Sequence, residues 1–519
     1  MRLLPGLALV TVFGLSTSCS SGGAGPSASA ASTAADAPAG PAVQLFALSD
    51  FHGWLFPRIL PSTSRYYGGI AHIGAAMKAA EIDGSLPPVI VDNGDMWTGP
   101  IESTFLEGAP VVEAYNVLGV AAANVANHEY DFGVEALQQR ASEARFPFLG
   151  ANIVETATGK SPSFLKPWII VKRGPVDVGI VGLSFKGTPE TTMAKHVVGL
   201  EFHDYAETLR REIPAVRAAG ADVVCVLLHD VPSVGHEVVR ELGGELQIDV
   251  MIAGQDHRRA HEVVEGVPVV NPGPFGTSFA SIVARLSPSL DAVSHVDVEI
   301  IEVSGSIESP PQPPMASLDA VAEAAREKTK SMTSERLGEL GRPLPVGSFA
   351  SSPLGQLIVD SWMSALADET DIAMLNHGAI RQALPAGEVT LGDITSVMPF
   401  ENNIYLVELT GEQLRTQLTV DHPVVSGLTW TYREKDGARE VVTMLDARGQ
   451  PLLDEKSYRV AILDFMYTGG DGYRFSELDA TPLDTGLSWR DPVIRRFRLA
   501  ETARRPLTPN PGGRARKVP

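Results

Sequence analysis

The stretch that decides the fold is Asn124-Val125-Ala126-Asn127-His128-Glu129-Tyr130-Asp131, in which an amide, an imidazole and two carboxylates directly follow an apolar run. The run from Ala121 to Ala126 is typical of a buried strand, so the Asn-His pair falls at its carboxyl end. Ligands of α/β sheets bind at such ends. Alone, the pair is more typical of an ordinary turn than of a ligand site, because Asn tolerates left-handed backbone. The rest of the chain must decide between these interpretations.

Four other apolar runs end in the same way. They are Val43 to Leu48 before Asp50 and His52, Val89 to Val91 before Asp95, Val223 to Leu228 before His229, and Ile248 to Ala253 before Gln255, Asp256 and His257. Carboxylate, imidazole and amide oxygens suit Mn, Fe, Zn or Co, and thiolate ligands are absent from these positions. A carboxylate such as Asp95, placed after a glycine, can bridge two metals about 3.5–4 Å apart and support in-line displacement at phosphorus.

Segments with helical periodicity alternate with the apolar runs. They are Ile70 to Ala80, Val111 to Leu118, Val134 to Ala144 and Tyr205 to Ala219. The runs Trp168 to Val171 and Val176 to Leu183 flank Arg173-Gly174-Pro175 and predict a hairpin. Fully apolar strands between helices predict an α/β fold with a sheet that is covered on both faces.

The composition limits the domain number and the partners. A chain of 519 residues is too long for one hydrophobic core and indicates two or three domains. With 42 Lys+Arg against 62 Asp+Glu, the net charge of −20 opposes binding to a nucleic-acid polymer, which needs a basic surface. A small anionic substrate stays compatible with this charge, since bound divalent metals can supply local positive charge.

The first residues have the pattern of an export signal. Arg2 precedes an apolar run, Leu3 to Leu15, that is too short to span a bilayer. The residues up to Cys19 resemble a bacterial lipobox, which implies a membrane contact through a lipid anchor at Cys19 and a flexible tether after it. The alternative is a periplasmic or secreted protein cleaved near Ala28 to Ala31. Cys225, within an apolar run, is predicted to be a buried core residue.

Taken in order, the motifs Asp50-x-His52, Gly94-Asp95, Asn127-His128-Glu129, His229 and Gly254-x-x-His257 resemble the signature of calcineurin-like metallophosphoesterases. The version with Asp131 and a further domain is similar to the 5'-nucleotidase family. This resemblance implies a β-sandwich flanked by helices (αββα), followed by a second α/β (α+β) substrate-binding domain. It also implies an exported hydrolase of the cell envelope that releases phosphate from nucleotides by attack of a metal-activated hydroxide.

The resemblance also implies roles for individual residues. Two divalent metal ions, Mn, Zn, Co or Fe, are expected. One metal would be held by Asp50, His52, Asp95 and His257. The other would be held by Asp95, Asn127, His229 and Gln255. His128 would stabilise or protonate the transition-state phosphate, and Asp131 would orient it.

A second constellation lies toward the C-terminus. Asn376 to Arg381 resembles the family loop whose Asn and Arg reach the substrate. Phe400 and Phe465 match an aromatic clamp, which can sandwich a base for about 1–3 kcal/mol per stack. Asp471, between glycines, matches a ribose-binding carboxylate. Either phenylalanine alone would be interpreted as core packing.

Three departures from the family pattern leave alternatives open. Ala126 stands where the family usually has Gly, and Gln255 stands where it usually has His. Ser348 and Ser351 stand where it commonly has an Arg and a Glu. The substrate could therefore be a 2',3'-cyclic nucleotide or a nucleotide sugar. The chain could also be a catalytically impaired, lipid-anchored nucleotide-binding protein.

These features divide the chain into six expected segments. They are an export signal at 1–18, a tether at 19–42, a metallophosphoesterase domain at 43–304, a Pro-rich linker and connecting helix at 305–335, a substrate-binding domain at 336–500, and a disordered tail at 501–519.

Overall fold

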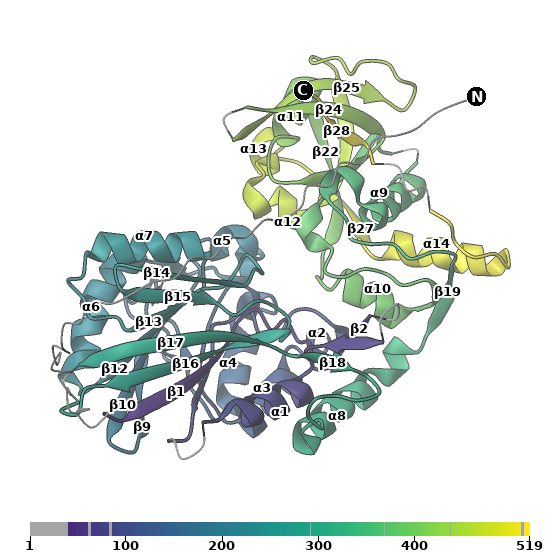
Figure 1. Cartoon of the computed structure of the whole chain (residues 1–519). Helices are drawn as coiled ribbons and strands as arrows, with labels where there is room; N and C mark the ends of the chain where they lie inside the picture. The colour runs from purple at the N-terminus through teal and green to yellow at the C-terminus, as the bar shows by residue number, and fades with distance from the viewer. Residues whose placement is uncertain are drawn as a thin grey trace, which may run out of the picture. The chain divides into compact units, whose positions relative to one another are not determined.

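Two β-sheets form the first half of the described chain. The computed structural model describes residues 40–60, 64–82, 86–290, 292–367, 369–435, 437–509 and 513–519. The predicted export signal, Cys19 and most of the tether lie outside these residues. Figure 1 shows the two sheets with helices on their outer faces.

The first sheet has seven strands in the order β17-β16-β1-β4-β5-β6-β8. Their bounds are β1 (Ala42–Leu48), β4 (Val89–Asp92), β5 (Val120–Asn124), β6 (Phe148–Leu149), β8 (Leu165–Lys166), β16 (Ser278–Leu286) and β17 (Val293–Glu302). The second sheet follows the order β14-β15-β13-β12-β10-β9. Its strands are β9 (Trp168–Arg173), β10 (Val176–Leu183), β12 (Val223–Leu228), β13 (Val250–Ile252), β14 (Ala260–Val264) and β15 (Val267–Asn271).

The strand alternation explains why helices cover both sheets. In β1, Leu45 and Ala47 face the core shared by the two sheets, whereas Phe46 and Leu48 face the core under the helices. The helices on the first sheet are α1 (Ile70–Ala80), α2 (Ile101–Thr104), α3 (Ala109–Leu118), α4 (Val134–Glu143) and α8 (Ala316–Thr333). Those on the second are α6 (Tyr205–Ala218) and α7 (Pro232–Leu242). The predicted αββα sandwich is confirmed.

Parallel pairing fixes where the functional loops emerge. In the first sheet β1, β4 and β5 are consecutive and parallel, and in the second sheet so are β10, β12 and β13. Because the carboxyl ends of parallel strands share one edge, the polar residues after them converge. Cys225, on β12, is fully buried between the sheets, as predicted.

Helix α8 does more than connect two parts of the chain. Its apolar stripe, Leu318, Val321 and Ala325, is buried in the core beneath the first sheet. The stripe repeats at three- and four-residue spacing, which places it on one helix face. The predicted connecting helix therefore packs as part of the first core, which the linker assignment at 305–335 did not include.

The second half has a separate core around a five-stranded sheet in the order β23-β20-β26-β22-β27. These strands are β20 (Ile372–Asn376), β22 (Asn403–Thr410), β23 (Pro423–Ser426), β26 (Ser457–Leu463) and β27 (Leu483–Ser488). The helices are α9 (Pro353–Ala365), α10 (Leu391–Val397), α11 (Gly411–Gln417), α12 (Asp464–Tyr467), α13 (Phe475–Leu478) and α14 (Asp491–Thr502). Smaller sheets pair β19 (Arg336–Leu340) with β21 (Gly387–Thr390), and β24 (Leu428–Lys435) with β25 (Ala438–Asp446).

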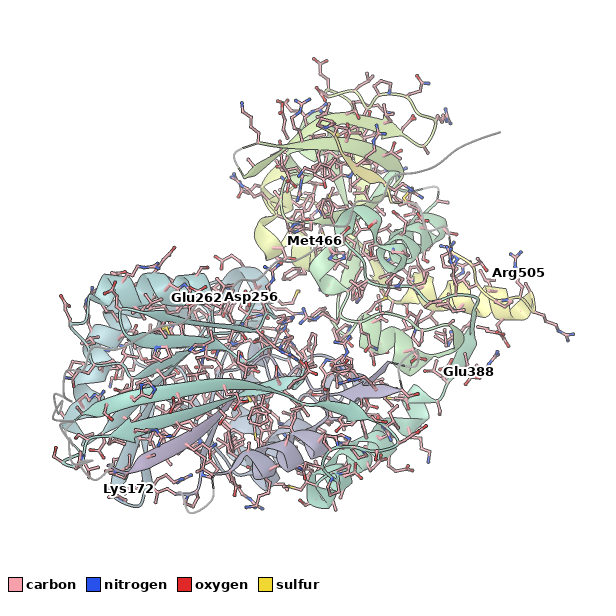
Figure 2. The ribbon with its side chains drawn as sticks, viewed as in Figure 1. Lys172, Asp256, Glu262, Glu388, Met466 and Arg505 are labelled. Carbon is pink, nitrogen blue, oxygen red and sulfur yellow. The ribbon has the colours of Figure 1, made fainter. Side chains whose placement is uncertain are left out.

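The surface carries the excess charge. Lys172, Glu262 and Glu388 point outward and are 78%, 68% and 63% exposed, while Met466 is buried (Figure 2). Within the described ranges we find no helix that is both long enough and apolar enough to cross a membrane.

The prediction of a disordered tail was wrong for residues 513–519. Strand β28 (Ala515–Lys517) pairs in parallel with β24, and the Arg514 guanidinium lies 3.1 Å from the Asp360 carboxylate. The same guanidinium donates to the Ser426 hydroxyl. A Pro-, Gly- and Arg-rich composition does not reveal main-chain pairing with a strand far away in sequence. Residues 510–512 lie outside the described ranges.

Substituting Arg514→Ala should lower the free energy of unfolding by about 1–3 kcal/mol, because Asp360 would lose a charged partner while staying half-buried. Chemical denaturation monitored by circular dichroism measures this change. The control is Arg516→Ala, at an exposed position of the same strand, which should stay within about 0.5 kcal/mol of the parent. Equal stability of both variants would mean that the tail contributes nothing through Arg514.

Candidate active site

The five predicted strand ends meet at one edge of the two sheets. Asp50 and His52 follow β1, Asp95 follows β4, Asn127 and His128 follow β5, His229 follows β12, and Gln255 and His257 follow β13. Most of these side chains are buried, and Asp50 and His229 are fully so. The structure therefore brings together all the residues that the sequence singled out in this half of the chain.

One group of side chains contains Asp50, His52, Asp95 and His257. The Nε2 atoms of His52 and His257 lie 3.0 Å apart. His257 Nε2 lies 3.6 Å from Asp50 Oδ1, and His52 Nε2 lies 3.8 Å from Asp95 Oδ2. These are the four residues expected to share one metal.

A second group centres on His229. Its Nε2 atom lies 2.8 Å from Gln255 Oε1, 3.2 Å from Asp95 Oδ2 and 3.7 Å from Asp50 Oδ1. Asp95 thus belongs to both groups. Gln255 turns its amide oxygen toward the other ligand atoms, as an oxygen ligand must. Asn127 Oδ1 is buried without a hydrogen-bond partner among the described residues.

The donor set fits divalent cations. His52 Nδ1 lies 2.8 Å from Thr98 O, and His229 Nδ1 lies 2.8 Å from Asn93 O. A carbonyl only accepts, so each Nδ1 donates its hydrogen and each Nε2 faces the carboxylates, the arrangement found for metal-ligating histidines. Three overlapping groups of carboxylates and imidazoles have ligand atoms within 4.8 Å of one another.

The buried carboxylates and the burial of the site shift the pKa values of the three histidines in different directions. Burial lowers the pKa of His229, but Asp95 and Asp50 outweigh burial and raise that pKa to about 10. Burial lowers the pKa of His257 to about 4 despite the nearby Asp50. Burial, together with the Arg381 charge, also holds the pKa of His52 well below its ordinary value. His52 and His257 are thus neutral, as metal ligation requires.

Backbone strain is concentrated at these loops. Non-glycine residues with positive φ include Asp50 (52°), His52 (48°), Asp95 (55°), Gln255 (65°) and His257 (57°). Such conformations are uncommon and persist where the surroundings over-determine them, often at functional sites. Ala126, the departure from glycine, is accommodated because Gly94 faces it: a Cβ on Gly94 would lie 2.8 Å from the Ala126 methyl.

His128 lies between the ligand groups and the pocket. Its Nδ1 atom lies 2.7 Å from Asp131 Oδ2, and its backbone N–H donates to Asp95 Oδ1 at 3.0 Å. Burial lowers the pKa of His128, but the Asp131 and Asp95 carboxylates outweigh burial and raise it above the ordinary value. His128 is thus suited to carry a proton.

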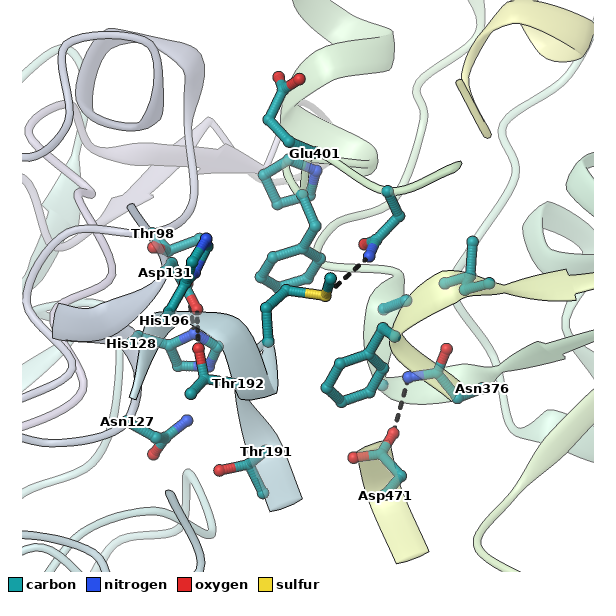
Figure 3. Close-up of a pocket in the computed structure, with 18 of the residues that line it drawn as sticks. Thr98, Asn127, His128, Asp131, Thr191, Thr192, His196, Asn376, Glu401 and Asp471 are labelled. Atoms are coloured by element: carbon teal, nitrogen blue, oxygen red, sulfur yellow. Dashed lines mark hydrogen bonds and ion pairs between the residues drawn. The ribbon is translucent and has the colours of Figure 1, made fainter. Parts of the chain in front are cut away.

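A cavity of about 230 Å³ adjoins these residues and is lined from both halves of the described chain. Figure 3 shows Asn127, His128 and Asp131 together with Asn376 and Asp471 around it. The predicted substrate residues that line it are Asn376, Arg381, Phe400, Phe465 and Asp471. The structure therefore brings all five to one cavity.

Contacts within this cavity define its polar and aromatic walls. Asn376 Nδ2 donates to Asp471 Oδ2 at 2.6 Å, while Asn376 Oδ1 is buried without a partner among the described residues. Arg381 Nη2 lies 3.2 Å from His52 Nε2. The Phe400 ring stacks on the His128 imidazole, with centroids 5.9 Å apart and planes at 20°. Burial raises the pKa of Asp471 to about 6.

One wall of the cavity was not predicted. It consists of α5 (Thr188–Thr191) and the residues after it, and it contributes Thr191, Thr192, Met193, Lys195 and His196. Thr192 Oγ1 donates to Asp131 Oδ1 at 3.4 Å, and Asn402 Nδ2 donates to the Met193 sulfur at 3.7 Å. This segment has no motif, and its only sequence signal is its place after β10, another parallel strand.

Ser348 and Ser351 lie outside the residues that line this cavity. Their hydroxyls hydrogen-bond each other at 3.0 Å. The positions where the family commonly has an Arg and a Glu thus contribute no charge to the cavity.

Comparison with known proteins identifies the second half directly. Residues 332–477 match the family model described as 5'-nucleotidase, C-terminal domain. The cell wall protein Lmo0130 of Listeria monocytogenes is 25% identical over 511 residues, which cover 83% of this chain and 64% of that protein. Endonuclease YhcR of Bacillus subtilis is 27% identical over 421 residues, 75% of this chain and 33% of that one. The chain thus spans less than two thirds of either protein.

Two further similarities cover most of both chains. The 5'-nucleotidase of Bos taurus is 25% identical over 482 residues, which cover 82% of each chain. The crystal structure of a 5'-nucleotidase precursor from Thermus thermophilus superposes with a TM-score of 0.81 at 21% identity, over 92% of this chain and 99% of that one. The latter similarity shows the shared two-part fold. The chain thus carries a 5'-nucleotidase C-terminal domain at residues 332–477, and its relatives and its fold are similar to those of 5'-nucleotidases.

Proposed function

We propose that the chain is an exported, dimetal phosphoester hydrolase that releases phosphate from nucleotides. The observation that carries the proposal is the position of Asp95, whose carboxylate belongs to two adjacent ligand groups at the end of a cavity with aromatic walls. The names of the bovine and bacterial 5'-nucleotidases to which the chain is similar support this activity. Similarity to exported relatives such as the cell wall protein supports the location.

Two metal ions would be held by the residues of the two groups. One ion would bind Asp50, His52, Asp95 and His257, and the other Asp95, Asn127, His229 and Gln255. The unpartnered oxygen of Asn127 supports its role as a ligand, because a buried amide oxygen needs a donor or a cation. When bound, such ions supply a nucleophile from water and neutralise charge on the phosphate.

The side chains around the ions would bind and orient the substrate. His128, held by Asp131, would donate its Nε2 proton to a phosphate oxygen as negative charge develops there. Arg381, directed at His52, would bind the phosphate from the other side. These contacts do not depend on the base, so they allow several phosphoester types.

The nucleoside would occupy the wider part of the cavity. Phe400 and Phe465 would sandwich the base, and Asp471 would accept hydrogen bonds from the ribose hydroxyls. Asp471 already accepts one bond from Asn376, which leaves its second oxygen for the ribose. The unpartnered Oδ1 of Asn376 would accept a hydrogen bond from the substrate.

Purified protein supplied with Mn²⁺, Zn²⁺ or Co²⁺ should release inorganic phosphate from at least one nucleoside monophosphate. The panel should also contain 2',3'-cyclic nucleotides and nucleotide sugars, with a phosphatase added to detect their first products. His128→Ala should lower kcat by roughly 10²- to 10⁴-fold, because it removes proton transfer to the phosphate. The matched control, His203→Ala, changes an imidazole that is 44% exposed and should leave kcat unchanged.

Absence of turnover across this panel would refute the hydrolase. One bound metal with unchanged background rates in His128→Ala would instead support a nucleotide-binding protein without catalysis.

The aromatic clamp predicts a substrate-dependent effect of Phe465→Ala. KM for a nucleotide should rise roughly 5- to 150-fold, the equivalent of one lost base stack of about 1–3 kcal/mol. Ribose 5-phosphate has no base and no aromatic ring, so its kinetic constants should stay the same. Phe465→Tyr, which preserves the stack, is the control. Equal losses on both substrates would show that Phe465 only supports the fold around Gly470, which its ring contacts.

Gly254→Ala should weaken metal binding about tenfold or more, because the added methyl group would displace Asp50, one of the proposed ligands. A Cβ at this position would lie 2.5 Å from Ser49 Oγ and 3.0 Å from Asp50 Oδ2. Metal content after dialysis, measured by plasma mass spectrometry, reports the change. Gly378→Ala is the control, since its Cβ would meet nothing within 4 Å. Retention of both metals by Gly254→Ala would contradict the ligand role of Asp50.

A further inference from the structure

Phe275 has a backbone conformation that needs an explanation. Its φ is 61°, in the left-handed region that bulky side chains rarely adopt. The turn that holds it is tightly bonded: Gly273 N–H donates to Asn271 Oδ1, and Thr277 N–H donates to Pro274 O. Strain of this kind persists only where the surroundings impose it.

The strained turn presents the phenyl ring to two imidazoles. The Phe275 centroid lies 5.1 Å from that of His257, edge to face at 71°, and 5.7 Å from that of His52, at 55°. The Phe275 backbone N–H donates to Asp50 O at 2.7 Å. Phe275 therefore contacts three of the four residues proposed for one metal, namely Asp50, His52 and His257.

His257 lacks the Nδ1–H hydrogen bond that usually fixes the orientation of a metal-ligating histidine. His52 and His229 each donate Nδ1–H to a backbone carbonyl. Among the described residues, Nδ1 of His257 has no hydrogen-bond partner, and the side chain is 29% exposed. The rings of His52, with its centroid 4.9 Å away, and of Phe275 are the aromatic contacts that restrict rotation of this imidazole, and Phe275 is the one of the two that is not itself a proposed ligand.

A second layer holds the phenyl ring in place. Trp54 lies 5.6 Å from it, centroid to centroid. The Arg58 guanidinium lies 4.8 Å from the Trp54 centroid and 5.3 Å from the Phe275 centroid, which suits cation–π contacts with both rings. The three side chains form a series of cation–π and tilted ring contacts that ends on His257 and His52.

We propose that Phe275 is a positioning residue that orients His257, and with it His52, for one of the two metals. The aromatic contact replaces the missing Nδ1 hydrogen bond, and the backbone strain is the cost of directing the ring at the imidazoles. The inference rests on the two-metal site proposed above, but it concerns only the first ligand group. The group around His229 has its own carbonyl contact and does not depend on Phe275.

Stepwise Mn²⁺ binding to the metal-free full chain tests this role, by calorimetry and by electron paramagnetic resonance. Phe275→Leu should weaken one of the two binding steps about 10- to 100-fold, the usual effect of losing an outer contact to a metal ligand, and leave the other unchanged. Phe275→Tyr should restore the parent constants, because the ring edge is preserved. Phe275→Gly adopts the positive φ without strain, so it keeps the turn folded if the leucine variant fails to fold, and it should lose the same step.

Identical binding constants in the parent, leucine and glycine variants would overturn the proposal, as would equal weakening of both steps. A parent chain that binds two Mn²⁺ but releases no phosphate would refute the hydrolase while leaving the effect of Phe275 measurable. Binding of none of Mn²⁺, Zn²⁺ and Co²⁺ by the parent would overturn both proposals.

Discussion

The carboxylate of Glu129 holds together the loops on which the site depends. It accepts backbone N–H bonds from Asp95 at 3.0 Å, Met96 at 2.7 Å and Ala126 at 2.7 Å, and it is fully buried. Burial and the Asp95 charge raise the pKa of Glu129 to about 8, against the stabilising effect of the three donors. The Glu129 side chain thus fixes the spacing between two loops. One loop follows β4 and carries Asp95, and the other follows β5 and carries Asn127.

This arrangement would allow an acidic protein to bind the anionic substrate proposed above. Asp50 and Asp95 are buried at one point, and their charges cost free energy unless cations neutralise them. His229 partly meets this demand, as its raised pKa shows. Divalent ions would meet it fully and would leave positive charge for a phosphate. The net charge of −20 therefore concerns the surface and does not argue against phosphate binding at this edge.

Much of the site could be predicted because its residues follow strands. Apolar runs mark the strands, and parallel pairing forces Asp50, Asp95 and His229 to one edge whatever the lengths of the connections. The alternation of apolar strands and helices predicted only a covered sheet, whereas the αββα sandwich was implied by the family resemblance. Features that depend on tertiary packing could not be predicted, because no local sequence pattern accompanies them. Examples are the cavity wall at Thr191–His196, the positive φ of Phe275 and the pairing of β28 with β24.

Gln255 illustrates how a departure from a motif can change chemistry without losing a site. Its strained backbone, with a φ of 65°, aims the side chain at His229, while its N–H donates to Asp50 Oδ1 at 3.0 Å. An amide oxygen is a harder ligand than an imidazole nitrogen, so the second site should favour Mn²⁺ over Zn²⁺ relative to a histidine at this position. The amide also carries an NH₂ group, and Gln255 lines the substrate cavity. With its oxygen toward the metal, it retains a donor for a phosphate oxygen, which an imidazole ligated through one nitrogen and held through the other does not.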